Sequence, residues 1–228
     1  MDLVASFVPE GARLLDVGSD HAYLPIALLQ EGKIEAAIAG EVVEGPYQSA
    51  VQNVADNGLD DKIEVRLANG LAAFEPTDSI SCITIAGMGG RLIADILAAG
   101  FSKLANVSRL VLQPNNREDE LRSWLVDHNF RIVDEAILEE NEKFYEILVV
   151  EQGSQELTAM ELRFGPYLMR EQAPAFVQKW SKEVEKLAFA LEQVPVENQS
   201  ARASLEERIA QIKEVLNVSK WSYQTLWS

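Results

Sequence analysis

The sequence has a single cysteine, Cys82, so an internal disulfide bond is excluded, and its apolar neighbours indicate a buried thiol. No run of about 18 apolar residues could span a membrane. The first residues lack a basic region ahead of an apolar one, which argues against a signal peptide. We therefore expect a cytoplasmic protein with no membrane partner, and we expect no metal site.

Positive charge is also scarce. The 228 residues include 20 Lys and Arg against 36 Asp and Glu, a net charge of −16, which argues against non-specific binding of nucleic acid. The imbalance is uneven, because residues 1–150 carry a net charge of −14 and residues 151–228 only −2. A polyanionic partner is therefore expected to bind the C-terminal part.

The stretch 14–25 predicts a short buried strand, a turn at Gly18 and then a helix. An acid at a strand end, a glycine and a helix start are typical of α/β folds that bind a nucleoside cofactor. The usual G-x-G-x-x-G is absent, since Asp20 and Ala22 occupy positions where glycine is expected. Asp20 would repel a pyrophosphate but not an amine or a sulfonium, which favours S-adenosylmethionine over NAD. The alternative is an ordinary strand–turn–helix without a ligand.

Apolar strands alternate with helices along the first 128 residues. Strands are predicted over 13–17, 36–41, 63–67, 80–86 and 109–112, with helices over 24–31, 46–57, 91–99 and 117–128. Strands over 130–137 and 144–150, joined by the link 139–143, predict an antiparallel hairpin. The fold class is therefore α/β, with a doubly wound seven-stranded sheet whose ligands lie beyond the carboxyl ends of the strands.

Unusual turns follow five of these strands. Glu41 lies roughly 20 residues past the first turn, where a carboxylate can accept hydrogen bonds from both ribose hydroxyls. Asn69 and Gly70 end the third strand, where small or amide side chains suit an adenine edge. The fourth strand meets glycines at 87, 89 and 90, and the fifth ends in 113–116, Gln-Pro-Asn-Asn. All five turns fall at one edge of the predicted sheet.

The pattern changes after residue 150. A helix is predicted over 161–172, and apolar residues then recur at steps of three and four on either side of Pro195: Phe176, Trp180, Val184, Leu187 and Leu191, then Leu205, Ile209, Ile212 and Leu216. Two such helices predict an antiparallel hairpin, a small coiled coil. We expect domains over 1–152 and 153–228. Lys179, Lys182 and Lys186 share a helix face that is either solvated or contacts phosphates, and the aromatic stretch 221–227 has no pattern.

The five turns resemble those of one family, in order and spacing. They are 16–23 (Asp-Val-Gly-Ser-Asp-His-Ala-Tyr), 39–46 (Ala-Gly-Glu-Val-Val-Glu-Gly-Pro), 68–71 (Ala-Asn-Gly-Leu), 85–90 (Ile-Ala-Gly-Met-Gly-Gly) and 112–115 (Leu-Gln-Pro-Asn). The chain resembles the bacterial tRNA (adenine-N1)-methyltransferases of the TrmK (YqfN) type, which modify the adenine at position 22 of tRNA. The resemblance covers most of the chain. It implies a class I (Rossmann-like) methyltransferase fold, S-adenosylmethionine as methyl donor, and a C-terminal coiled coil that assists tRNA binding.

Site residues follow from these turns and from the resemblance. The residues expected to bind the cofactor are Asp16, Gly18, Asp20, His21, Glu41, Asn69, Gly70, Ala86 and Gly87. Those expected to act on the substrate are Asp20, Tyr23, Gln113 and Asn115. Gln113 occupies the place of the amide that holds the target base in many base-modifying methyltransferases. Adenine N1 has a free lone pair, so the reaction needs alignment and relief of positive charge rather than a general base.

Two other functions stay open at this point. One is methylation of a small molecule, with the helical hairpin serving only to form a homodimer. The other is a catalytically inactive module that binds the cofactor and recruits partners through the hairpin. Methylation of bulk tRNA in vitro separates the first function from both alternatives.

Overall fold

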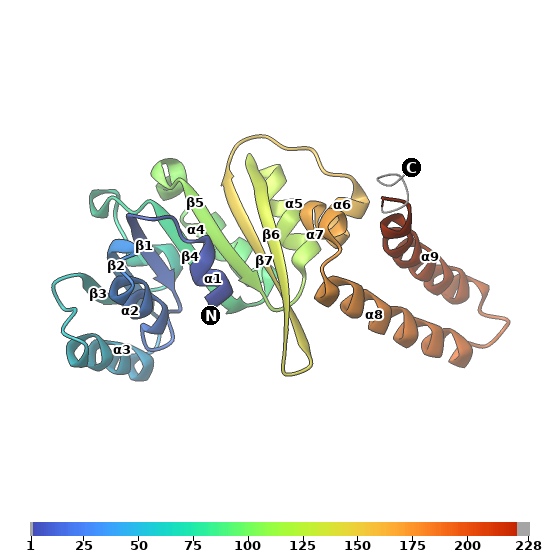
Figure 1. Cartoon of the computed structure of the whole chain (residues 1–228), viewed down its shortest axis with the longest axis horizontal. Coiled ribbons are helices and arrows are strands. Elements are labelled where there is room, and N and C mark those ends of the chain that lie inside the picture. Colours follow the sequence, from blue (N-terminus) through green and yellow to red (C-terminus); the bar gives the residue numbers. More distant parts are fainter. Residues whose placement is uncertain (1, 223–228) are drawn as a thin grey trace. The chain divides into compact units, whose positions relative to one another are not determined.

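The computed structural model describes residues 2–222 (Figure 1), and it describes side chains up to residue 216. The strands are β1 (Ala12–Val17), β2 (Ile34–Glu41), β3 (Ile63–Leu67), β4 (Cys82–Met88), β5 (Arg109–Pro114), β6 (Phe130–Glu140) and β7 (Lys143–Gln152). The helices are α1 (Asp2–Phe7), α2 (Tyr23–Gln30), α3 (Glu44–Asp56), α4 (Gly90–Ala99), α5 (Glu118–Asp127), α6 (Ala159–Phe164), α7 (Pro166–Glu171), α8 (Pro174–Gln193) and α9 (Gln199–Ser222). Three 3₁₀ turns are η1 (Gly70–Ala73), η2 (Pro76–Asp78) and η3 (Phe101–Asn106).

The seven strands form one sheet in the order β3-β2-β1-β4-β5-β7-β6, which confirms the predicted fold class. The first five strands pair in parallel, and β7 pairs with β5 in the antiparallel sense. Right-handed crossovers place α2 and α3 on one face and α4 on the other, because the strand order reverses between β1 and β4. A reversal of this kind opens the crevice in which such sheets bind ligands.

Three differences from the predicted ranges have a clear structural form, beyond shifts of two or three residues at other element ends. The helix predicted over 161–172 is two short helices, because Gly165 has a φ of 85° and Pro166 cannot continue the hydrogen bonding of α6. The link between β6 and β7 is shorter than predicted, since Asn141 and Glu142 both adopt positive φ and close a two-residue turn. Strand β4 begins at Cys82 and runs on to Met88.

A buried cluster of charged side chains connects α5 with the last two strands of the sheet, β6 and β7. Arg122 of α5 is fully buried, and its guanidinium donates hydrogen bonds to Glu135 (2.8 Å) and Glu146 (2.5 Å), whose side chains are equally buried. Burial opposes its charge, but the two carboxylates together raise the pKa of Arg122 above its usual value. The cluster ties α5 to β6 and β7.

By its packing the chain forms two compact units. One comprises residues up to Glu135 together with Glu146–Glu156, and the other comprises Ala136–Tyr145 with the residues from Leu157 on. The tip of the β6–β7 hairpin is thus part of the second unit. The predicted functional division into 1–152 and 153–228 stays a prediction, since packing alone assigns no activity.

The second unit has its own apolar core around the paired helices α8 and α9. Its buried members are Ile137, Phe164, Leu168, Phe176, Trp180, Leu187, Ile212 and Val215, with Val184, Leu205, Ile209 and Leu216 packed against them. The predicted helical hairpin is therefore confirmed, whereas the stretch 221–227 falls largely outside the described residues. Among residues 2–222, no helix combines the length and apolar character needed to cross a bilayer.

Candidate active site

The turn between β1 and α2 is built from left-handed backbone. Gly18 has a φ of 67°, and Asp20, His21 and Ala22 follow with φ of 45°, 68° and 61°. A Cβ on Gly18 would lie 2.5 Å from Cε of Met88, a flexible side-chain end that can shift, so it is the left-handed φ that favours glycine there. Three successive L-residues in this region are strained, and such strain clusters at functional sites. The turn is held in place because the backbone N–H of Gly18 donates to the carbonyl of Gly40 (2.9 Å).

Asp16 anchors this turn from within the sheet. Its side chain is buried, and its two oxygens accept hydrogen bonds from the hydroxyls of Ser19 and Thr84, both at 2.5 Å. Burial raises the pKa of Asp16, and the two hydroxyl hydrogen bonds oppose this by favouring the ionised form. Asp16 is therefore placed to fix the turn, with both carboxylate oxygens already in use.

Glu41, at the end of β2, has an unused acceptor. Its side chain is only 5% exposed, and among the described residues nothing hydrogen-bonds to its buried Oε1. Burial raises the pKa of Glu41; a backbone hydrogen bond from Asp20 lowers it, while the charges of Asp16 and Asp20 raise it further. A buried acceptor without a donor is unfavourable, so this oxygen fits a hydroxyl-bearing ligand such as a ribose.

The side chains of the first turn that face solvent come from Asp20, His21 and Tyr23. The Asp20 side chain is 82% exposed, with Oδ1 lying 3.6 Å from Nε2 of His21. The rings of His21 and Tyr23 lie 5.5 Å apart, and Tyr23 is exposed. Helix α3 steadies the turn, because the amide of Asn53 donates to the carbonyl of His21 (3.0 Å). The strained backbone thus presents a carboxylate and two rings outward.

The turns after β4 and β5 hold each other through a closed set of hydrogen bonds. The backbone N–H of Gly87 donates to Oε1 of Gln113 (3.0 Å), Nε2 of Gln113 donates to Oδ1 of Asn115 (3.0 Å), and Nδ2 of Asn115 donates to the carbonyl of Gly87 (2.7 Å). The backbone N–H of Asn115 also donates to the carbonyl of Met88 (2.7 Å). Gln113 and Asn115 therefore have fixed amide orientations around the Gly87 peptide.

Close contacts between the same two turns account for Gly89 and Gly90. A Cβ on Gly90 would lie 2.4 Å from the carbonyl oxygen of Arg117, and one on Gly89 would lie 3.0 Å from Oδ1 of Asn116. The N–H of Gly90 donates to the carbonyl of Asn116 (2.9 Å). The glycines thus let two chain segments approach closely, in addition to any role toward a ligand.

The third turn, after β3, borders a hollow of about 280 Å³ in the first unit. The hollow is lined by Asn69 and Gly70, by Leu92 and Asp95 of α4, and by Lys103 of η3. The Asn69 side chain is exposed and does not cap η1, so its amide is oriented by nothing in the described chain. A flat nitrogen-rich ring would find both apolar walls and an amide here.

Every predicted site residue thus belongs to the first unit and lies at or just after the carboxyl end of β1 to β5. Three supporting residues, Ser19, Thr84 and Asn53, were not predicted from the sequence. The sequence could have indicated Thr84, because a hydroxyl inside a buried strand needs a hydrogen-bond partner. Nothing in the sequence indicates the contact of Asn53. Among the described residues, no group of three or more His, Cys, Asp or Glu side chains is arranged for a metal ion.

A family model agrees with this arrangement. The TrmK model, described as tRNA (adenine(22)-N(1))-methyltransferase, matches residues 14–214, which include all five turns and most of the helical hairpin. The chain belongs to the TrmK family. The resemblance inferred from the turns is therefore confirmed.

Individual proteins match over nearly the whole chain. The tRNA (adenine(22)-N(1))-methyltransferase of Bacillus subtilis is 38% identical over 228 residues, which cover 95% of each chain. The crystal structure of Streptococcus pneumoniae Sp1610 is 68% identical, with a TM-score of 0.93 over 94% of this chain and 97% of that one. A second structure of Sp1610, in complex with S-adenosyl-L-methionine, matches with 67% identity and a TM-score of 0.88 over the same shares.

Proposed function

We propose that this chain transfers a methyl group from S-adenosylmethionine to N1 of adenine 22 in tRNA. The family match over residues 14–214 carries the proposal. The unpartnered Oε1 of Glu41 supports the cofactor independently, because it offers a buried acceptor where a ribose is expected. A cytoplasmic location and self-association through the hairpin stay predictions.

The donor supplies an electrophilic methyl group on a sulfonium centre. Glu41 would hold the ribose hydroxyls, Asn69 and Gly70 the adenine edge, and Gly18, His21, Ala86 and Gly87 the remaining backbone contacts. Asp16, which uses both oxygens within the fold, would act by holding the first turn in place. Asp20 would place an exposed negative charge beside a cationic ligand. The residues present therefore fit this cofactor.

Recognition of the target base falls to Gln113 and Asn115 in this proposal. The side-chain oxygen of Gln113 accepts one hydrogen bond from Gly87, and that of Asn115 accepts one from Gln113. Each oxygen therefore keeps a second lone pair for a ligand. Such an acceptor suits the 6-amino group of adenine and repels the 6-oxo group of guanine. Tyr23, exposed beside the first turn, would stack on the base, which must leave its own stack to reach the site.

The proposal is tested by incubating the protein with labelled S-adenosylmethionine and two tRNA transcripts that differ only in adenine or guanine at position 22. We expect N1-methyladenine, identified by mass spectrometry after nuclease digestion, only in the first transcript. Cofactor binding without methylation of either transcript would instead support the non-catalytic alternative. Turnover on small acceptors alone would support the small-molecule alternative.

Glu41→Ala should weaken S-adenosylmethionine binding by about 1–2 kcal/mol, because the ribose loses a buried charged acceptor. Calorimetry measures the change, with Glu44→Ala as the control. Glu44 lies three residues further on, but its carboxylate is exposed and accepts from the amide of Gln48 (2.7 Å). Equal affinities for Glu41→Ala and the wild type would remove Glu41 from the cofactor site.

Replacing Lys179, Lys182 and Lys186 together with glutamine should weaken tRNA binding. The slope of log K against log salt should fall by about 0.7–0.9 for each phosphate that the variant no longer neutralises. The stripe is not wholly solvated, since Nζ of Lys182 lies 3.3 Å from Glu139, so we expect fewer than three phosphates to be involved. Filter binding over a range of salt concentrations measures the slope, with Lys62→Gln as a control in the first unit. Weaker binding at an unchanged slope would mean that the hairpin itself had been altered.

A further inference from the structure

The segment between β3 and β4 contains no strand and no α-helix. It consists of the 3₁₀ turns η1 and η2 with their connections, yet it carries Asn69 and Leu71 into the hollow at the end of β3. Short 3₁₀ turns have poor hydrogen-bond geometry and hold little structure on their own. The segment is anchored in part by its own buried side chains, those of Leu71, Ala73 and Phe74. Two basic side chains outside it, those of Arg66 and Lys103, hold its backbone carbonyls.

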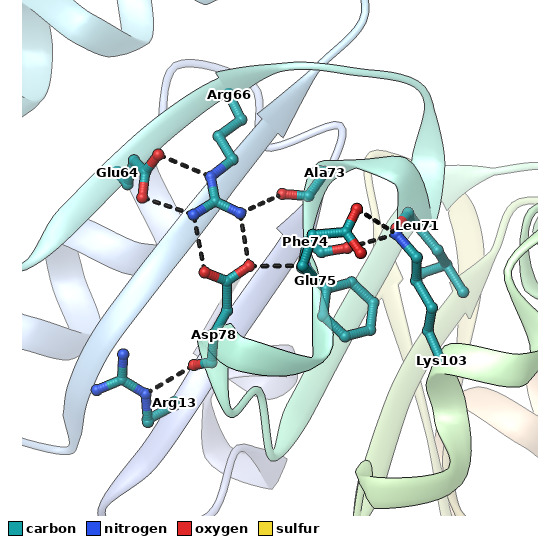
Figure 2. Close-up of polar contacts among 9 residues, drawn as sticks. All are labelled: Arg13, Glu64, Arg66, Leu71, Ala73, Phe74, Glu75, Asp78 and Lys103. Carbon is teal, nitrogen blue, oxygen red and sulfur yellow. Dashed lines mark hydrogen bonds and ion pairs between the residues drawn. The ribbon is translucent and has the colours of Figure 1, made fainter.

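Arg66 fixes the far part of the segment (Figure 2). Its guanidinium donates to Glu64 (2.8 and 2.7 Å), to Asp78 (2.6 and 2.9 Å) and to the carbonyl of Ala73 (3.0 Å), which uses all five of its N–H groups. Asp78 also accepts from the backbone N–H of Glu75 (2.7 Å). The hydrogen bonds from Arg66 lower the pKa of Asp78 to about 2, so Asp78 stays ionised and paired with Arg66 throughout the neutral range.

Lys103 of η3 fixes the near part (Figure 2). Its ammonium donates to the carbonyl oxygens of Leu71 (3.1 Å) and Phe74 (2.5 Å) and to Oε1 of Glu75 (3.1 Å). These contacts use all three N–H groups, and the side chain is only 22% exposed. All three donors of the Lys103 ammonium therefore bind this segment, and none is left for an RNA phosphate.

Close packing makes the placement of the segment sensitive to Lys103. A Cβ on Gly100 would lie 2.4 Å from Cβ of Leu71, and one on Gly70 would lie 2.9 Å from Cγ2 of Ile96. The segment thus already touches α4 and the start of η3 with no room to move closer. Loss of the ammonium leaves two carbonyl oxygens without this donor and frees the segment to shift away from η3.

We propose that Lys103 is a positioning residue for the cofactor. By binding the carbonyls of Leu71 and Phe74, it sets where Asn69 to Leu71 meet the adenine end, so that its ammonium acts on cofactor binding through this segment. The inference rests on the proposed function, because it assumes that S-adenosylmethionine binds at this edge. Its consequence is a loss of affinity confined to the adenosine half of the cofactor.

Lys33 provides a matched control. Its ammonium also donates to two backbone carbonyls of the same unit, those of Ala5 (2.7 Å) and Ser6 (3.0 Å), but these lie in α1, away from the predicted cofactor residues. Lys33→Met and Lys103→Met therefore remove the same kind of contact at two places. A purely structural role predicts similar losses of melting temperature and equal cofactor affinity for the two variants.

The experiment measures binding of S-adenosylhomocysteine and of 5′-methylthioadenosine, which carries only the adenosine half, by calorimetry on the full chain. We expect Lys103→Met to weaken both ligands about tenfold, Lys103→Arg to weaken them less, and Lys33→Met to leave both within twofold of the wild type. In turnover, Lys103→Met should raise the cofactor KM while kcat stays within twofold.

Three outcomes would count against this assignment in different ways. If Lys103→Met binds both ligands as Lys33→Met does, the positioning role is overturned. Should Lys103→Met fail to fold, Lys103→Arg decides, and wild-type affinity for both ligands in that variant would overturn it too. A wild-type chain that binds neither ligand would instead overturn the proposed function, and the inference with it.

Discussion

Asp20→Asn should slow methyl transfer at least tenfold, and up to about a hundredfold, which corresponds to roughly 1.4–2.7 kcal/mol in activation free energy. Its exposed carboxylate lies beside two buried acids, Asp16 and Glu41, and its charge raises the pKa of both. A cationic ligand relieves this repulsion, and the methylated base is itself formed as a cation. Loss of the Asp20 charge therefore removes stabilisation that the fold supplies in advance.

The substitution is chosen to leave the backbone undisturbed. Asp20 has a φ of 45°, a region that asparagine tolerates well, so the apo protein should lose less than about 1 kcal/mol of stability. Melting temperature, cofactor affinity and single-turnover rate should be measured on one preparation. Asp60→Asn, which removes another exposed charge ahead of β3, is the control. Wild-type turnover in Asp20→Asn would end the proposal, and a much lower melting temperature would make Asp20 a structural residue.

Arg122→Met should destabilise the fold by about 3–5 kcal/mol, because two buried carboxylates lose their shared cation. Glu135 and Glu146 have side chains that are at most 1% exposed, so water cannot replace the guanidinium without local opening. Equilibrium unfolding in urea, followed by circular dichroism, gives the change in free energy.

A triple variant isolates the cause of this destabilisation. Replacing Arg122 with methionine and both glutamates with leucine removes the buried charges together, and the resulting stability should lie within about 2 kcal/mol of the wild type or above it. A triple variant as unstable as Arg122→Met would mean that packing volume, rather than uncompensated charge, holds this region together.

The sheet and its turns could be predicted because they follow from local patterns. Apolar runs such as 82–85 are buried as predicted, and Gly18 occupies a left-handed position that its sequence context indicates. The non-glycine residues of the same turn, Asp20 to Ala22, were not predicted to be left-handed. Their conformation depends on Asn53 and on the carbonyl of Gly40, which come from other elements.

Long-range contacts between side chains and backbone explain most of what the sequence could not indicate. Gln113 was predicted to hold the target base, and in the structure its amide oxygen also accepts a hydrogen bond from the backbone N–H of Gly87. The role of Lys103 could not be predicted, because its partners are backbone carbonyls about 30 residues earlier in the chain. Every residue has a carbonyl, so the sequence does not indicate which ones a lysine will bind. The Lys182 contact with Glu139 likewise joins α8 to a hairpin tip 43 residues away.

The placement of Ala136–Tyr145 in the second unit has a consequence for recombination and for protein engineering. The chain passes between the two units three times, after Glu135, after Tyr145 and after Glu156, so no single crossover point separates them. A fragment that begins at Leu157 would lack Ile137, a buried member of the helical core, and Phe144, which packs against that core. To be fused to another protein with its core intact, the helical unit must therefore include the tip of the β6–β7 hairpin, residues 136–145.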